Sequence, residues 1–239
     1  MQKLWLLRKF VINLFIKWFE RRNIYISKKR HLNDFTLSSR IQSTFVLLSP
    51  NVLHIGAHSG QEAEFYENCR AQVLWLEANP EQMPELVKNI SRFPKQTAKN
   101  FLLGDKQEHA VPFFVSENQG ASSSIFELAD SALTTAPRLV RQLNLDMYRL
   151  EDLFSSRELG TFRHWVLDVQ GAELQVLKGA GNLLKCAQSI LIEAKRESEY
   201  EGGVSWNELQ DFLHENGFQN LWEPIDNEED NILFIRVRN

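Results

Sequence analysis

The stretch "NVLHIGAHSGQEAEFY", residues 51–66, decides the fold class of this chain. Residues 51–55 are mostly apolar, as is typical of a short buried strand. A glycine-punctuated turn follows at residues 56–60, and residues 60–69 have the pattern of a helix. A strand, a glycine turn and a helix in this order begin an open α/β sheet, in which ligands bind beyond the carboxyl ends of the strands. The sequence therefore predicts a ligand site at this turn.

The same alternation continues along the chain and ends in a different pattern. Buried strands are predicted at residues 72–78, 99–104, 164–169 and 189–194, and helices at 80–90, 172–180 and 205–217, with Ser205 as the cap of the last one. Two strand-like runs at 218–225 and 231–237 then follow, with no room for a helix between them. This predicts a Rossmann-like, doubly wound, mostly parallel seven-stranded α/β sheet that ends in an antiparallel hairpin.

The N-terminal segment, residues 1–31, differs from the α/β domain predicted at residues 32–239. Residues 1–22 would form an amphipathic helix, with Lys9 and Lys17 on one face and Leu, Phe and Trp side chains on the other. Its apolar runs are far shorter than the roughly 18 residues that span a bilayer. Two interpretations stay open: peripheral contact of residues 1–22 with anionic lipid headgroups at the inner membrane surface, or packing on the domain or on a second subunit.

Composition excludes several classes of function. The formal net charge of −4 argues against nucleic acid as a partner, because few cations are available to displace its counterions. Two cysteines are too few for a disulfide framework, which favours a reducing, cytoplasmic location. No His, Asp or Glu cluster has metal-ligand spacing, so no metal site is predicted, and metal dependence is left open by the sequence. The oligomeric state is left open by the sequence.

The glycine turn has an acidic partner further along the chain. Glu77 ends the next predicted strand, about 20 residues after Gly56, where an acid accepts hydrogen bonds from the ribose hydroxyls of an adenosine-containing ligand. The alternative is that Glu77 only caps the next helix. By position, Ala57 and Gly60 would approach the same ligand, and Asp168 would end the strand beside the reacting centre.

The stretch "LDVQGAELQVLKGA", residues 167–180, resembles the FkbM family of S-adenosylmethionine-dependent class I methyltransferases. Other blocks resemble the family in the same order, and the resemblance covers roughly residues 50–220: "HIGAHSGQE", "LWLEANPE", "GASSSIFE", "YRLEDLF" and "LIEAKRESEY". It implies S-adenosylmethionine as cofactor and O-methylation of a hydroxyl on a sugar, polysaccharide or secondary metabolite. The chain departs from the family in two places, with His54 where many members have an acid and Gln170 where Glu is commoner.

Candidate roles follow from the resemblance and the predicted fold. Asp168 is the first candidate for the base or the orienter of the acceptor, and Glu193 and Glu173 are further catalytic candidates, although Glu173 could simply complement a helix dipole. Asp105 could contact the adenine amino group or stabilise a turn. The cofactor-binding candidates are His54, Gly56, Ala57, His58, Gly60, Glu77 and Asp105. His54 lies inside a predicted strand, where a histidine is more often a buried core residue.

Residues 116–142 form a long polar insertion without a predicted strand or helix, of the kind that often provides a lid. Its Ser122, Ser123 and Ser124 suit the hydroxyls of a small-molecule or glycan acceptor, although such serines often make only a turn. Two other classes of function remain: a non-catalytic scaffold that binds the cofactor or a partner, and a nucleotide-linked oxidoreductase. The missing G-x-G-x-x-G motif and the terminal hairpin disfavour the oxidoreductase.

Overall fold

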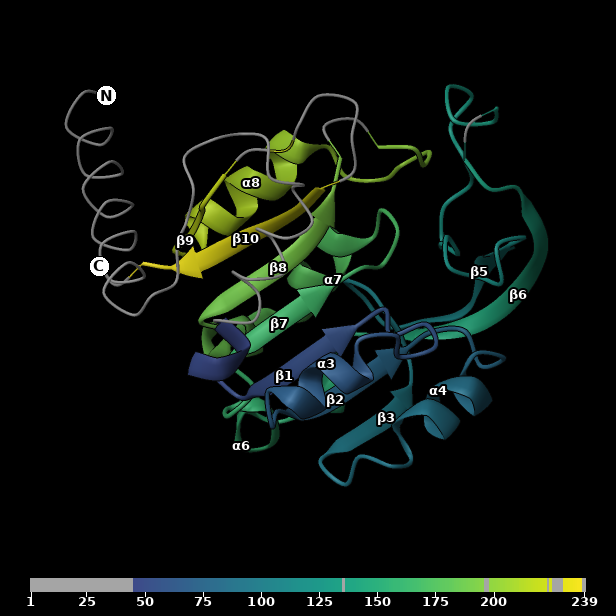
Figure 1. Ribbon diagram of the computed structural model, residues 1–239. Coiled ribbons are helices and arrows are strands. Elements are labelled where there is room, and N and C mark those ends of the chain that lie inside the picture. The colour runs from purple at the N-terminus through teal and green to yellow at the C-terminus, as the bar shows by residue number, and fades with distance from the viewer. Residues whose placement is uncertain (1–44, 135, 196–197, 223, 225–229, 238–239) are drawn as a thin grey trace, which may run out of the picture. The chain divides into compact units, whose positions relative to one another are not determined.

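The computed structural model describes residues 45–134, 136–195, 198–222, 224 and 230–237, so the predicted N-terminal helix lies outside the described residues. Seven strands form the main sheet in the order β3-β2-β1-β7-β8-β10-β9 (Figure 1). All neighbours pair in parallel except β10, which is antiparallel to both β8 and β9. The predicted fold class is confirmed. The strands are β1 (Asn51–Ile55), β2 (Gln72–Glu77), β3 (Gln96–Asn100), β7 (His164–Leu167), β8 (Ser189–Ala194), β9 (Phe218–Asn220) and β10 (Asp230–Arg236).

Helices cover both faces of the main sheet because alternate strand residues are apolar on each side. Leu53 of β1 and its neighbours on one face belong to a core that also contains Leu177 and Leu209. On the other face, His54 and Trp75 contact Tyr66. The helices are α3 (Ala63–Asn68), α4 (Met83–Ile90), α5 (Leu150–Leu153), α6 (Ser156–Leu159), α7 (Glu173–Gly179), the 3₁₀ helix η1 (Gly181–Cys186) and α8 (Trp206–Glu215).

The predicted N-terminal cap of α8 is confirmed by its hydrogen bonds. The Ser205 hydroxyl accepts from the Glu208 backbone N–H at 3.4 Å, and the Glu208 carboxylate accepts from the Ser205 N–H at 3.1 Å. This reciprocal pair satisfies two backbone donors that a helix start leaves open.

A second, three-stranded sheet corrects two predictions. Its order is β4-β6-β5, with β4 (Leu102–Leu103), β5 (Glu108–Ser116) and β6 (Leu139–Tyr148). The single strand predicted at 99–104 is wrong, because the chain leaves the main sheet at Asn100 and Leu102–Leu103 pair with Met147–Tyr148. The insertion at 116–142 is likewise partly regular, since β6 begins at Leu139. Figure 1 shows the β5–β6 pair extending away from the main sheet. No helix within the described residues is long and apolar enough to cross a membrane.

Candidate active site

The carboxyl ends of β1, β2 and β7 surround a pocket of about 610 Å³ that is open to solvent. Parallel strands bring these ends to one edge of the sheet, which places Gly56, Glu77 and Asp168 around the same space. We call it the first pocket. Its lining is Ile55, Gly56, His58, Leu76, Glu77, Ala78, Phe101, Leu102, Leu103, Phe113, Gly120, Ala121, Ser123, Ile125, Asp168, Val169, Gln170 and Ala172.

The turn after β1 requires glycine. Gly56 has φ of +86°, and a Cβ there would lie 1.6 Å from the Asp168 carbonyl oxygen. Gly60 has φ of +72° and packs against Leu86 of α4, so it supports the turn without lining the pocket. Ala57 is buried and also lies outside the lining. Of the predicted turn residues, Gly56 and His58 line the pocket.

Glu77 is a buried carboxylate with a fixed orientation. Its Oε2 accepts from the His58 backbone N–H at 2.6 Å, and its Oε1 accepts from the Asn79 N–H at 2.7 Å. Burial raises the pKa of Glu77, and these two hydrogen bonds act in the opposite direction. A carboxyl oxygen has more than one lone pair, so each oxygen keeps acceptor capacity toward the pocket. The bond to Asn79 holds the turn before α4, which begins four residues later at Met83.

The loop at residues 117–124 closes one side of the first pocket. The His58 Nε2–H donates to the Gln119 carbonyl at 3.0 Å, because a carbonyl can only accept, and the amide of Gln82 donates to the same oxygen. Among the predicted serines, Ser123 lines the pocket and donates to the Gly120 carbonyl at 2.7 Å. Ser122 and Ser124 lie outside the lining. Their polar atoms bond to Asn118, Tyr200, Gln170 and their neighbours.

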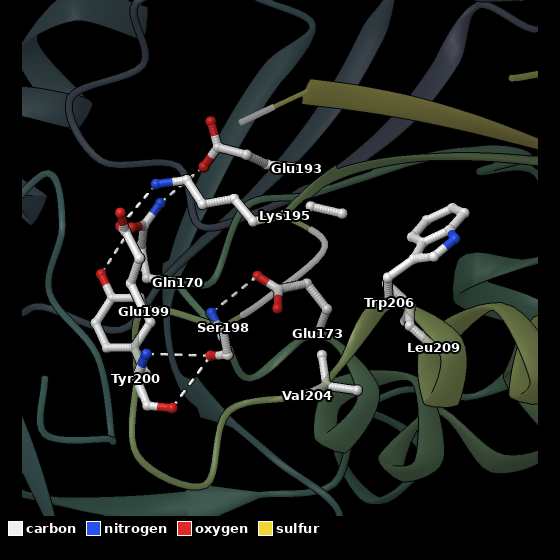
Figure 2. A pocket seen from close by; sticks show the side chains of 12 residues that line it. Gln170, Glu173, Glu193, Lys195, Ser198, Glu199, Tyr200, Val204, Trp206 and Leu209 are labelled. Atoms are coloured by element: carbon white, nitrogen blue, oxygen red, sulfur yellow. Dashed lines mark hydrogen bonds and ion pairs between the residues drawn. The ribbon is translucent and has the colours of Figure 1, made fainter. Parts of the chain in front are cut away.

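Asp168 and Glu193 are joined through one amide. The Gln170 Nε2 donates to Asp168 Oδ1 at 2.6 Å. It also donates to Glu193 Oε2 at 2.8 Å, and the Gln170 Oε1 accepts from the Tyr200 hydroxyl at 2.9 Å (Figure 2). Gln170 and Tyr200 were not among the predicted site residues. A motif shows which residues are present, whereas this bridge depends on a left-handed backbone at Gln170, with φ of +54°.

Gln170 also lines a second pocket of about 460 Å³, beside the end of β8 (Figure 2). Because Asp168 lines the first pocket, Glu193 lines the second and Gln170 lines both, the bridge stands where the two pockets meet. The other residues that line the second pocket are Gly171, Glu173, Ala194, Lys195, Ser198, Glu199, Tyr200, Val204, Trp206 and Leu209.

Glu173 supports the turn that presents Gln170. Its Oε1 accepts from the backbone N–H groups of Val169 at 3.1 Å and Gly171 at 3.2 Å. The side chain is 4% exposed. Burial, together with the charge of Asp168, raises its pKa to about 7, and the backbone hydrogen bonds act in the opposite direction.

Two further predicted cofactor residues, like Ala57 and Gly60, do not line the first pocket. His54 lies in the core, where its Nδ1 shares a hydrogen bond of 3.0 Å with the Tyr66 hydroxyl and its ring stacks on Trp75 at 4.6 Å between centroids. Burial lowers the pKa of His54 to about 4, so its imidazole is neutral at pH 7. Asp105 is exposed beyond β4. The sequence-based interpretation missed an apolar wall formed by Phe101, Leu102, Phe113 and Ile125.

The first pocket fits S-adenosylmethionine, which the resemblance implies. The Glu77 carboxylate would accept hydrogen bonds from the ribose hydroxyls, and the apolar wall would cover the adenine ring. A Cβ at Gly56 would fill the space beside Asp168, so the glycine leaves room for close backbone approach. Within the described ranges, no group of three or more His, Cys, Asp or Glu side chains could hold a metal ion.

Comparisons with known proteins identify the family of the chain. The family model described as the methyltransferase FkbM domain matches residues 54–219. No curated protein matches the chain.

Solved structures show distant likenesses that concern the fold alone. An uncharacterized Listeria monocytogenes protein has 8% identity and a TM-score of 0.49, over 90% of this chain and 70% of its own. M. capricolum TrmK in complex with S-adenosyl-homocysteine has 8% identity and a TM-score of 0.43, over 83% of this chain and 65% of the TrmK chain. Aeropyrum pernix fibrillarin in complex with S-adenosyl-L-methionine has 10% identity and a TM-score of 0.44, over 83% of this chain and 74% of the fibrillarin chain. Because the family model spans most of its length, the chain belongs to the FkbM methyltransferase domain family and is an S-adenosylmethionine-dependent methyltransferase.

Proposed function

We propose that this methyltransferase acts on a hydroxyl group of a sugar, a polysaccharide or another polyhydroxylated metabolite. The observation that carries the proposal is the pair of carboxylates, Asp168 and Glu193, at the junction of the two pockets. Hydroxyl groups donate hydrogen bonds to carboxylates, and a hydroxyl must lose its proton when it is methylated.

In this proposal the first pocket binds the cofactor and the second pocket binds the acceptor. The cofactor, when bound, supplies an electrophilic methyl group. Glu77 and the backbone at Gly56 hold and orient it in the first pocket, while the second pocket receives the acceptor. Asp168 then accepts the proton of the acceptor hydroxyl, and Glu193 orients a neighbouring hydroxyl of the same molecule. Alignment of this kind can remove several kcal/mol from a barrier.

The charges around the junction support a neutral, hydroxyl-rich acceptor. Glu193, Glu199 and Asp168 would repel a phosphate group, and Lys195 is engaged by Glu199 at 2.6 Å. The formal net charge of −4 likewise disfavours an RNA acceptor.

The test is transfer of a radiolabelled methyl group from S-adenosylmethionine to four acceptor classes: neutral glycans, hydroxylated small metabolites, primary amines and RNA. We expect label in the hydroxyl acceptors, and a loss of about 100-fold or more in Asp168→Asn with S-adenosylhomocysteine binding retained. Label in amines or RNA alone would contradict O-methylation. Cofactor binding without transfer to any class would favour the scaffold.

A further inference from the structure

The Gln170 side chain supplies one hydrogen bond to each of two carboxylates. An amide nitrogen carries two hydrogens, and here one points to Asp168 at 2.6 Å and the other to Glu193 at 2.8 Å. The backbone of Gln170 is held in place as well, because the Ser124 hydroxyl donates to its carbonyl at 2.7 Å. Two carboxylates therefore lie within hydrogen-bond distance of the same nitrogen.

The orientation of this amide is fixed by its partners. If the amide were flipped, its oxygen would face the two carboxylates, and three acceptors would meet without a hydrogen between them. In the orientation observed, Oε1 instead accepts from the Tyr200 hydroxyl at 2.9 Å. Tyr200 is 8% exposed, and its hydroxyl also lies 3.2 Å from the Ser122 carbonyl.

The other charged groups around the pair are mostly acidic. Glu77 at the end of β2 and Glu173 of α7 are both electrostatically coupled to Asp168. His54 of β1 also faces Asp168, but burial lowers its pKa to about 4, so it carries no charge at pH 7.

On the side of Glu193, the second pocket contains Lys195, which pairs with Glu199. In this part of the described chain, carboxylates thus outnumber cations around the bridge.

We propose that Gln170 is a positioning residue that keeps Asp168 and Glu193 ionised side by side at neutral pH. Two carboxylates that share a site without a donor between them retain a proton to higher pH. The amide takes the place of that proton, since it supplies hydrogen bonds to both groups and carries no charge. This inference rests on the proposed function, in which an acceptor hydroxyl replaces one amide N–H and gives its proton to Asp168.

Two substitutions separate this role from a merely structural one. Gln170→Met keeps the length of the side chain and removes both hydrogen bonds, and Gln170→Glu keeps the shape and adds a third carboxylate. In either variant the pair should retain a proton to higher pH. The matched control is Tyr200→Phe, which removes the hydroxyl at the other end of the amide and leaves both amide–carboxylate bonds in place.

The experiment is a ¹³C NMR titration of the full chain with labelled Asp and Glu carboxyl carbons, without cofactor or acceptor. Resonances of the pair are assigned by their loss in Asp168→Asn and Glu193→Gln. We expect the last titration step of the pair to move up by about one pH unit or more in both Gln170 variants, and to stay in place in Tyr200→Phe. If Gln170→Met does not fold, an unchanged titration in the isosteric Gln170→Glu still overturns the role of Gln170.

The outcomes distinguish the role of Gln170 from the proposed function. Unchanged titration in a folded Gln170 variant, or an equal shift in Tyr200→Phe, overturns the role of Gln170. Because no methyl transfer is measured, this result leaves the proposed function untouched. A shifted titration in a protein that methylates none of the hydroxyl acceptors supports the role of Gln170 and removes O-methylation.

Discussion

Glu77 is the residue on which cofactor affinity should depend most directly. We expect Glu77→Ala to weaken S-adenosylhomocysteine binding about tenfold or more, because hydrogen bonds to a charged group contribute about 1.5–3 kcal/mol. The same change leaves the His58 and Asn79 N–H groups without their acceptor. Unfolding free energy should therefore fall by about 1–3 kcal/mol for each group left unsatisfied.

Calorimetric titration with S-adenosylhomocysteine measures the affinity, with NAD as a parallel ligand that should not bind. Asp105→Ala is the control, because Asp105 is exposed and lies outside the lining of the first pocket. Unchanged binding in Glu77→Ala would show that the first pocket does not hold the ribose. Weaker binding in Asp105→Ala would restore its predicted contact with adenine.

Glu173 should make stability fall as the pH rises. Its pKa in the folded chain is about 7 against an ordinary value of 4.5, so its contribution is fully present below pH 4.5 and is lost as the pH rises through 7. Glu173→Gln keeps the oxygen that accepts from Val169 and Gly171 but cannot ionise. We compare the free energy of unfolding of the variant with that of the unsubstituted chain. Between pH 5 and pH 8, we expect this difference to change in favour of the variant by up to about 3 kcal/mol.

Urea denaturation of both chains at the two pH values measures this gain. His54 and His164 have pKa values lowered by burial to about 4 and about 3, so their contributions are lost in the opposite direction, as the pH falls below 6.5. Both histidines are present in both chains, so their contributions cancel in the difference in unfolding free energy between the two chains. An equal difference in stability at both pH values would show that Glu173 is ionised throughout this range.

At the scale of the element, the sequence predicts the strands that are buried on both faces and misses those that are not. β1 and β8 have the predicted bounds because short apolar runs between turn residues leave few alternatives. β6 went unpredicted because most of its residues are exposed or half-buried, so it shows no apolar run. β5 contains the apolar run 110–115, but Pro112 interrupts it, and a proline inside a run argues against a strand. The run at 99–104 was assigned to one strand, since hydrophobicity does not tell which neighbour a strand pairs with.

The same limit applies to the site. Gly56, Glu77 and Asp168 could be predicted because each ends a strand of a known kind of sheet, where backbone order alone fixes their position. Gln170 and Tyr200 are 30 residues apart and meet only through side-chain contacts, which no spacing rule encodes. For His54 the core alternative holds, because strand alternation puts its side chain on the face that packs against Tyr66.

The loop at 117–124 is the element whose removal should affect binding most. Replacing residues 118–124 by a short Gly-Ser linker removes the Gln119 carbonyl that accepts from His58, and three residues of the pocket lining. We expect weaker S-adenosylhomocysteine binding and loss of acceptor turnover. Leu133→Ser, in the same insertion but 55% exposed and outside both pockets, should change neither. Turnover that survives the replacement would exclude a lid role for this loop.

At the scale of the whole molecule, both pockets lie at the carboxyl edge of one sheet, and the described residues that line them fall between positions 55 and 209. Residues 44–239 form one compact unit that contains them all. The N-terminal segment has a basic and apolar composition that suits attachment to another surface.

This division predicts that cofactor binding and membrane binding can be separated. A chain that begins at residue 44 should bind S-adenosylhomocysteine with the affinity of the full chain. Only the full chain should co-sediment with vesicles that contain anionic lipid, and salt should weaken that association because headgroup attraction is screened. Vesicles of neutral lipid are the control. If the full chain binds neither kind of vesicle but forms a dimer that the shorter chain does not form, then residues 1–43 bind a second subunit. If the shorter chain loses cofactor affinity, then residues 1–43 contribute to the first pocket.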